Sequence, residues 1–178
     1  MTAPAETSPL SDGYTLHQFD SIDGTNAEAL RSGARPGHVY IARTQSAGRG
    51  RQGRNWVSPG GNLYATICTQ PPSDRNPAQL AFVAGLAVFD TVSEEAPDTT
   101  FTLKWPNDIL ADGKKISGML IEAGERGYAV GIGINIVASP PDDEVRYPAT
   151  SWRECTGITP QPYDLLTRLC HHFDTWNQ

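Results

Sequence analysis

The sequence has 178 residues, 38% of them hydrophobic, and a formal net charge of −6. A chain of this length and composition can bury the core of one globular domain, and its acidic balance argues against a basic chain that coats nucleic acid. Its three cysteines lie far apart without any Cys-x-x-Cys spacing, which argues against a disulfide framework or a zinc site and favours free thiols in a reducing cytoplasm.

The N-terminal residues 1–13 are polar and contain proline, and they lack the apolar stretch of a signal peptide. We therefore predict a disordered tail there, followed by one domain over residues 14–178. No apolar segment approaches the length that spans a bilayer. Together these features predict a cytoplasmic protein without a membrane partner.

The first predicted helix begins at Thr25. Residues 25–28 have the Ser/Thr-x-x-Glu form of a capping box, which predicts a short helix that ends at about residues 30–32. Residues 38–44 have the composition of a strand, which would deliver Gln45 into the loop that follows.

A strand and a long helix are predicted next. Residues 62–70 alternate two sets of side chains, as a strand does, and Pro77 can occupy the first turn of a helix over residues 77–95. The apolar stripe of that helix consists of Leu80, Val83, Ala84, Ala87 and Val88. We expect Phe82 and Phe89 to lie in the core and not to contact a ligand.

Two hairpins are predicted in the middle of the chain. Residues 101–105 form a short strand, and the Asp-Gly pair at residues 112–113 is a strong turn signal after residues 109–110. Residues 116–122 and 128–137 would pair in a second hairpin. Hairpins with interspersed helices predict an α+β fold with a mixed, largely antiparallel sheet covered by helices.

The last predicted element is an amphipathic helix over residues 164–176. Its apolar side chains, spaced toward a core, are Leu165, Leu166, Leu169, Phe173 and Trp176. His171 and His172 are adjacent in this helix and therefore face different ways, so we interpret both as surface residues.

The loop at residues 48–56, called the arginine loop below, is the most informative segment, because it combines three arginines with three glycines. Glycine lets backbone N–H groups approach a ligand, and each guanidinium offers a planar fork of donors to a phosphate or carboxylate. The chain has three lysines, which all follow this loop within a span of twelve positions: Lys104, Lys114 and Lys115. Two alternatives stay open for the loop alone: a solvated surface turn, or a flexible nucleic-acid-binding segment. The Walker pattern Gly-x-x-x-x-Gly-Lys-Ser/Thr is absent.

Five segments in this order resemble the catalytic core of biotin protein ligases, also called holocarboxylase synthetases. They are DGTN at 23–26, QxxGRGRxGRxW at 45–56, KWPND at 104–108, KxxG at 115–118 and GIGIN at 131–135. The resemblance covers about residues 14–178, and its arginine loop and KWPND motif are highly specific. It implies an ATP-dependent enzyme that makes biotinyl-5′-AMP and transfers biotin to a lysine of a biotin carboxyl carrier protein or domain.

The resemblance also assigns candidate site residues. Those for biotin are Thr25, Asn26, Gln45, Gly48, Arg49, Arg51, Lys115, Gly118, Gly131 and Gly133. Those for the nucleotide are Arg51, Arg54, Trp56, Lys104, Asn107 and Asn135. Trp105 would join Trp56 on the adenine side, and for both tryptophans a purely structural role is the alternative. The implied catalytic residues are Lys115, Arg51 and Arg49. Asp108 is a candidate ligand for Mg²⁺, a base for the acceptor amine, or a simple turn carboxylate.

The sequence departs from the family pattern in places. Gly24 stands where serine is usual, which puts one contact to the ureido ring of biotin in doubt, and a backbone N–H is the candidate replacement. Nothing before Tyr14 predicts a DNA-binding domain, so we expect no nucleic-acid partner, and the small C-terminal β-barrel of relatives is not expected either. A homodimer is compatible with the sequence. The alternatives are a lipoate–protein ligase and a non-catalytic biotin- or adenylate-binding module.

Overall fold

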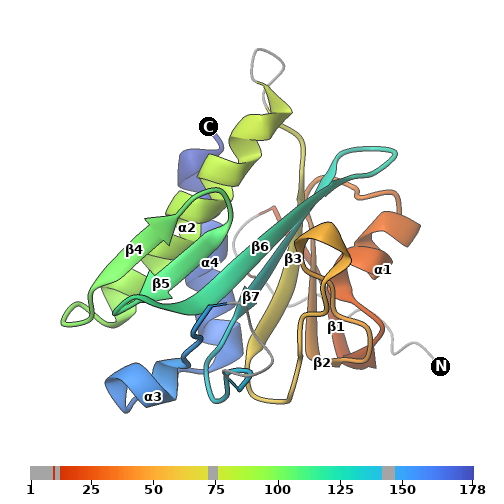
Figure 1. Ribbon diagram of the computed structural model, residues 1–178. Coiled ribbons are helices and arrows are strands. Elements are labelled where there is room, and N and C mark those ends of the chain that lie inside the picture. Colours follow the sequence, from red (N-terminus) through yellow and green to blue (C-terminus); the bar gives the residue numbers. More distant parts are fainter. Residues whose placement is uncertain (1–9, 11–12, 72–75, 142–146) are drawn as a thin grey trace.

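The computed structural model describes residue 10 and residues 13–71, 76–141 and 147–178, which form one seven-stranded sheet with helices on both faces (Figure 1). The strands are β1 (Thr15–Ile22), β2 (His38–Gln45), β3 (Leu63–Thr69), β4 (Phe101–Lys104), β5 (Asp108–Ala111), β6 (Lys114–Ala123) and β7 (Tyr128–Ile134). Their order in the sheet is β1-β2-β3-β7-β6-β5-β4. Among these described strands β1 and β2 pair in parallel and the others pair antiparallel, so the predicted mixed, largely antiparallel sheet is confirmed.

Two long helices, α2 (Leu80–Glu95) and α4 (Pro162–Trp176), cover one face of the sheet, and the short helix α1 (Thr25–Arg31) lies on the other. Beside them are helix α3 (Trp152–Thr156) and the short 3₁₀ turns η1 (Arg51–Gly53) and η2 (Pro77–Gln79). Strand β3 shows the two faces by its alternation. Ile67 belongs to the main core beneath α2 and α4, whereas the next residue, Cys68, packs with Ala29 of α1 in a second cluster.

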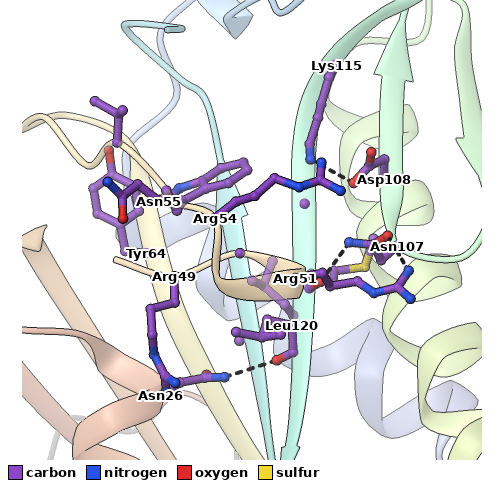
Figure 2. A pocket seen from close by; sticks show the side chains of 18 of the residues that line it. Asn26, Arg49, Arg51, Arg54, Asn55, Tyr64, Asn107, Asp108, Lys115 and Leu120 are labelled. Carbon is purple, nitrogen blue, oxygen red and sulfur yellow. Dashed lines mark hydrogen bonds and ion pairs between the residues drawn. The ribbon is translucent and has the colours of Figure 1, made fainter. Parts of the chain in front are cut away.

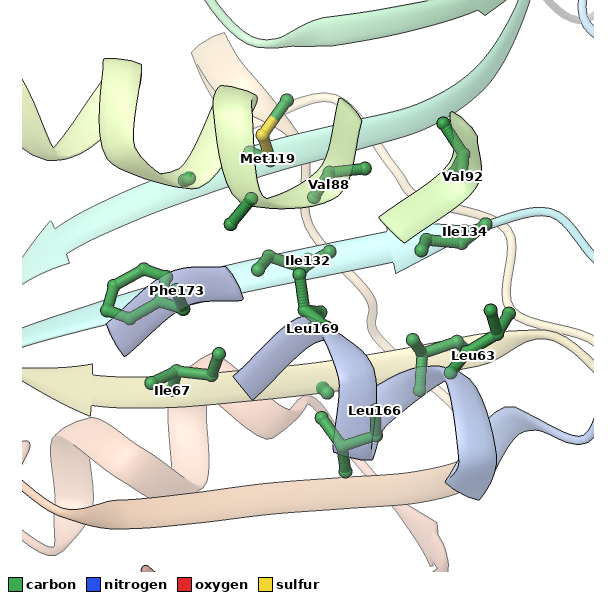
Figure 3. Packing of buried hydrophobic residues seen from close by; sticks show 14 of the residues in the cluster. Leu63, Ile67, Val88, Val92, Met119, Ile132, Ile134, Leu166, Leu169 and Phe173 are labelled. Carbon is green, nitrogen blue, oxygen red and sulfur yellow. The ribbon is translucent and has the colours of Figure 1, made fainter. Parts of the chain in front are cut away.

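The main core fills the face of the sheet beneath α2 and α4. Figure 3 shows Leu166, Leu169 and Phe173 of α4 pointing toward β3 and β7, beside Val88 and Val92 of α2. All five side chains are buried. Burying one such side chain stabilises the fold by roughly 1.5–3 kcal/mol. Because close packing leaves little room on this face, the opposite face, under α1, is the one that can hold a ligand.

Most of the predicted elements are confirmed with small shifts at their ends. Residues 38–44 lie in β2, residues 62–70 contain β3, and Pro77 opens the 3₁₀ turn that leads into α2. The Asp-Gly turn joins β5 to β6, with positive φ of 47° at Asp112 and 81° at Gly113, as a tight hairpin turn requires. Strand β4 ends at Lys104 and β7 at Ile134, which is shorter than predicted.

The predicted capping box is wrong. Gly24, in an extended conformation, is the N-cap of α1, so Thr25 already lies in the first turn, and Gly24 has no side chain that could cap the helix. The Glu28 carboxylate turns to Arg31, with 2.6 Å between the charged atoms, and does not reach back to the start of the helix. Thr25 is therefore free to direct its hydroxyl toward the sheet.

Three side chains lie elsewhere than expected. Phe82 is 51% exposed and Trp176 is 41% exposed, because the faces of α2 and α4 on which they lie are turned from the sheet. His172 is not a surface residue. Its side chain is held between α2 and α4, where its Nε2 atom lies 3.0 Å from Glu94 Oε2. Phe89 packs against the main core as predicted.

Strand β1 and helix α3 were not predicted at all. The exposure of β1 alternates irregularly, with Leu16 as its one fully buried apolar residue, because the strand lies at the sheet edge and pairs on one side with β2. Of the predicted tail, residues 1–9 and 11–12 lie outside the described residues, and Leu10 is buried in the main core. In the part of the chain that the structure describes, no helix has the length and apolar character needed to cross a bilayer.

Candidate active site

A cavity of about 670 Å³ opens on the face of the sheet that carries α1 (Figure 2). Strands β3, β6 and β7 form its floor, and its walls are α1, the loop at residues 47–57 and the β4–β5 turn. The predicted site residues around it are Thr25, Asn26, Gln45, Arg49, Arg51, Arg54, Trp56, Lys104, Asn107, Asp108, Lys115, Gly118, Gly131, Gly133 and Asn135. The fold thus brings all five sequence motifs to one cavity, while the chemical role of each residue stays a prediction.

Gly48 is a predicted biotin-site residue that does not line the cavity. A Cβ atom at this position would lie 2.5 Å from the carbonyl oxygen of Trp56 and 2.7 Å from Oγ of Ser58. Backbone and hydroxyl oxygens cannot yield that much room, so glycine is needed here for the arginine loop to pack. Its contribution is to the shape of the loop.

The glycines of β6 and β7 make room for protein side chains that enter the cavity. A Cβ atom on Gly131 would lie 2.3 Å from Oδ1 of Asn26, and one on Gly133 would lie 2.6 Å from the ring of Trp56. A Cβ atom on Gly118 would lie 2.9 Å from the same ring. Asn26 and Trp56 therefore lie flat against the sheet because these three positions lack side chains.

One end of the cavity holds neutral hydrogen-bonding groups. The Thr25 backbone N–H donates to Oε1 of Gln45 at 2.8 Å, and the hydroxyls of Thr25 and Thr66 lie 2.9 Å apart. The Thr66 hydroxyl donates to Oδ1 of Asn26 at 2.7 Å. Such hydroxyl and amide groups suit a ligand with neutral donors and acceptors.

Gly24 also lines this end, but its backbone N–H is already occupied. It donates to Oδ1 of Asp23 at 2.8 Å, and Asp23 pairs with Arg31 at 2.7 Å. The hydrogen bonds from Arg31 hold the pKa of Asp23 well below its usual range, at about 2. The N–H of Gly24 is therefore engaged within the protein and is not the replacement contact that the missing serine seemed to require.

The other end of the cavity is cationic. The Nζ atom of Lys115 lies 2.7 Å from Oδ1 of Asp108 and 5.2 Å from the centre of the Trp56 ring. Lys114, which precedes it on β6, points away and lies 3.9 Å from Glu154 with half of its side chain exposed. Because side chains alternate along a strand, only one of the two adjacent lysines can face the cavity.

The arginine loop folds as a small hairpin over the cavity. Its closing hydrogen bonds run from the Gly50 N–H to the Arg54 carbonyl at 2.7 Å and from the Trp56 N–H to the Gly48 carbonyl at 2.9 Å. At its tip, Arg51 donates to Oδ1 of Asn107 at 3.1 Å. The tip of the loop is thereby joined to the β4–β5 turn across the cavity.

The three arginines point in different directions. Figure 2 shows Arg54 extending toward the side of Lys115 and Asp108, and Arg49 descending toward Asn26. Arg54 donates to Gln52 at 2.8 Å, whereas Arg49 pairs with Glu122 of β6 at 3.0 Å. In this structure Arg49 therefore lies at the neutral end of the cavity, and its predicted catalytic role stays a prediction.

The remaining predicted nucleotide residues lie at the rim or are engaged in the fold. Lys104 lies over the ring of Tyr147, with Nζ 3.4 Å from its centre. Trp105 is half-exposed and stacks on Phe82 at 4.4 Å between ring centres. Asn135 is buried, and its amide donates to the Thr150 carbonyl at 3.1 Å.

The site contains no activated thiol. Burial raises the pKa of the Cys68 and Cys170 thiols to about 12, and both are free, as expected. A thiol with such a pKa is protonated at neutral pH and is a poor nucleophile. Cys155 is also free, and desolvation raises its pKa.

Sequence reasoning missed several polar residues that hold the cavity-lining side chains in place. Thr66 and Glu122 lie outside all five motifs but contact Asn26 directly, and Ser58 accepts a hydrogen bond from Gln45 at 2.9 Å. Thr66 and Glu122 could have been found from their positions in the strands. Both lie in strands at places where alternation turns them to the face opposite the apolar core.

Comparisons with known proteins agree with this geometry. Residues 18–137 match the model of the Biotin/lipoate A/B protein ligase family. A biotin–[acetyl-CoA-carboxylase] ligase of Paracoccus denitrificans is 39% identical over 86% of this chain and 69% of its own length. A bifunctional ligase/repressor of Bacillus subtilis is also 39% identical, over 78% of this chain, but the chain spans only 45% of that protein.

Solved structures show the same architecture. The biotin protein ligase from Aquifex aeolicus, in complex with biotin and ATP, superposes with a TM-score of 0.79 at 32% sequence identity. The match covers 91% of this chain and 71% of that one. A biotin protein ligase from Leishmania major in complex with biotinyl-5-AMP matches with a TM-score of 0.76 at 30% identity.

Proposed function

This chain belongs to the biotin/lipoate A/B protein ligase family, among its biotin ligases, and we propose that it activates biotin as biotinyl-5′-AMP and transfers it to a lysine of a carrier protein. One observation supports this function above the others. A single cavity has neutral hydrogen-bonding groups around Thr25 and Gln45 at one end and the ammonium of Lys115 at the other. Biotin has the same two ends, a neutral ureido ring and a carboxylate.

The proposed orientation of biotin follows from this match. The ureido ring would lie beside Thr25, Asn26 and Gln45, and the valeryl chain would run past Asn26 and Trp56, whose side chains lie over Gly131 and Gly133. The carboxylate would then reach Lys115. Because Lys114 points away from the cavity and Lys104 lies over Tyr147 at the rim, Lys115 is the lysine that would contact both the carboxylate and the α-phosphate of ATP.

In the first half-reaction, a carboxylate oxygen of biotin attacks the α-phosphorus of ATP, and pyrophosphate leaves. The two reactants are both anions, so the site must reduce their repulsion and align them. Lys115 would bind the carboxylate and the α-phosphate, while Arg51 and Arg54 would hold the polyphosphate. Trp56 and Asn135 would support the adenosine.

In the second half-reaction, the neutral amine of an acceptor lysine attacks the carbonyl carbon of the adenylate, and AMP leaves. The amine must first lose a proton, because free lysine has a pKa near 10.4. Asp108, a carboxylate that lines the cavity, would be the base that accepts it. We propose a biotin carboxyl carrier protein or domain in the cytoplasm as the partner.

Mg²⁺ would accompany ATP. Among the described residues no group of three or more His, Cys, Asp or Glu side chains could hold a metal, and the cavity offers Asp108 as a carboxylate. Mg²⁺ is commonly bound by one or two carboxylates together with substrate phosphates. The residues therefore fit an ion that enters with the nucleotide, held by Asp108 and phosphate oxygens.

Pyrophosphate exchange tests the function directly. Labelled pyrophosphate should enter ATP when biotin and Mg²⁺ are present, and not when lipoate replaces biotin. Exchange with lipoate alone would show a lipoate ligase instead. Binding of biotin without any exchange would show a non-catalytic binding module.

A further inference from the structure

Glu122 of β6 connects helix α1 to the arginine loop, although it belongs to none of the sequence motifs. Its Oε2 atom accepts a hydrogen bond from Nδ2 of Asn26 at 2.9 Å and pairs with Nη2 of Arg49 at 3.0 Å. The Glu122 side chain is 23% exposed, whereas that of Arg49 is 48% exposed. One carboxylate oxygen therefore holds an amide from α1 and a guanidinium from the arginine loop.

The Asn26 side of this contact leads to the neutral end of the cavity. Asn26 accepts from Thr66, whose hydroxyl lies beside that of Thr25, and Thr25 donates its N–H to Gln45. These are the groups proposed to bind the ureido ring. Asn26 keeps its place only because Gly131 leaves room beneath it.

The Arg49 side leads into the loop. Arg49 forms an isolated antiparallel bridge with Asn55, so it belongs to the hairpin that carries Arg51 over the cavity. The far end of the loop joins the same network, because Nε2 of Gln45 donates to Ser58 and the Ser58 hydroxyl donates to the Trp56 carbonyl. The loop is thus attached to the biotin end at both of its arms.

We propose that Glu122 is a positioning residue that attaches the arginine loop to the biotin-binding floor through Arg49 and Asn26. This inference rests on the proposed function for its effect on catalysis, but not for its effect on the loop. Without the carboxylate, Asn26 Nδ2 keeps only the Leu120 carbonyl, at 3.1 Å, and Arg49 loses its ion-pair partner. The arginine loop would then cover the cavity less often, and the protein would bind biotin less tightly.

The matched control is Glu125. It lies in the exposed turn between β6 and β7, so Glu125→Ala removes the same charge from nearly the same place in the sequence without touching the network. Glu122→Gln serves as the second variant, because it keeps one acceptor oxygen in place and removes only the charge. Thermal unfolding of all variants checks that they are folded.

The first measurement needs no substrate. Hydrogen–deuterium exchange of residues 46–57 in the ligand-free protein reports loop order through the hydrogen-bonded amides of Gly50 and Trp56. We expect Glu122→Ala to speed this exchange by about fivefold, as loss of one partly exposed charged hydrogen bond implies. Glu125→Ala should match the wild type. Equal loop exchange in Glu122→Ala and the wild type overturns the proposal, whether or not the protein ligates biotin.

The second measurement tests whether Glu122 acts through Arg49. Biotin affinity by calorimetry and the KM and kcat of pyrophosphate exchange are measured for Glu122→Ala, Arg49→Ala and the double variant. We expect Glu122→Ala to raise the biotin Kd and KM by about fivefold with a smaller change in kcat, and to add little once Arg49 is gone. Full additivity of the two substitutions, or a loss in kcat alone, refutes the positioning role. If the wild type fails to exchange pyrophosphate, the proposed function fails while the loop measurement still decides this inference.

Discussion

The Nζ atom of Lys115 and the Oδ1 atom of Asp108 lie 2.7 Å apart at the cationic end of the cavity. The two residues are brought together by the β5–β6 hairpin, whose register shifts between Ile109 and Leu110. Both side chains are more than half buried, so the ammonium is held in one place before a ligand arrives. That position distinguishes Lys115 from Lys114, which points away from the cavity toward Glu154.

We expect Lys115→Ala to lower the rate of biotinyl-AMP formation by about a hundredfold or more, because it removes a charge that would bind both reactants. Lys114→Ala is the control, since that lysine points toward Glu154 outside the cavity, and its effect should be mild. The measurement is the initial rate of biotin-dependent pyrophosphate exchange. Similar losses in the two variants would contradict the assignment of Lys115.

Arg51→Gly should release the intermediate faster than it slows synthesis. In the structure Arg51 joins the loop to Asn107 across the cavity, so its loss frees the loop at the tip. The expected results are a faster dissociation rate of preformed biotinyl-AMP and stray biotinylation of a bystander protein such as albumin. If synthesis and carrier labelling fall together without faster release, Arg51 is a phosphate contact and not part of a lid.

Gly24→Ser should strengthen biotin binding. A Cβ atom at Gly24 would meet its nearest neighbours at 3.7–3.8 Å, which is ordinary contact, and the extended backbone there accepts any residue. The added hydroxyl would face the neutral end of the cavity and supply one more hydrogen bond, a gain of about 0.5–1.5 kcal/mol. Calorimetric titration with biotin checks this, with Gly60→Ser outside the cavity as control. Unchanged or weaker binding would show that the ring does not lie against Gly24.

Gly131→Ala should destabilise the fold and weaken biotin binding together. The new methyl group would lie 2.3 Å from Oδ1 of Asn26, so Asn26 must leave the sheet and break its bonds to Thr66 and Glu122. Overpacking of this kind costs about 1–3 kcal/mol in the free energy of unfolding. Urea unfolding measures it, and Gly60→Ala, which meets only Thr44 at 3.9 Å, should be neutral. A Gly131→Ala protein as stable as the wild type would mean that Asn26 has another place to lie.

We expect the protein to lose stability in mild acid, because protonation of His17 and His38 is disfavoured in the folded state. Its Nε2 atom lies 2.9 Å from Nδ1 of His38, and burial, together with His38, lowers the pKa of His17. Burial, together with Arg35, lowers the pKa of His38 too, while Glu28 opposes the shift at His17. A lowered pKa means that the unfolded chain binds protons more readily, so stability falls as pH drops below about 6.5.

The test compares the wild type with His17→Gln at pH 7.5 and pH 5.5 by thermal unfolding. The wild type should lose on the order of 2 °C more in Tm between these two pH values than the variant does. His172 and the carboxylates are common to both proteins, so the difference isolates the histidine pair. An identical pH dependence in the two would show that the pair does not titrate in this range.

The sequence by itself determined the features that depend on neighbours along the chain. Alternation in residues 62–70, the stripe of the helix beginning near Pro77 and the Asp-Gly turn all follow from local geometry, and each is confirmed. The predicted site residues were expected to form one site, and with the exception of Gly48 they line one cavity.

Only the tertiary structure decided how the side chains of that site pair. Arg49 and Glu122 are 73 residues apart in the chain, and no periodicity relates them. The same holds for Phe82, whose helix position suited a core residue but whose ring stacks on Trp105 at the surface. Backbone hydrogen bonding and hydrophobic spacing act over a few residues, so they specify strands and helices. Which surface side chains meet depends on how those elements pack, because the partners come from distant parts of the chain.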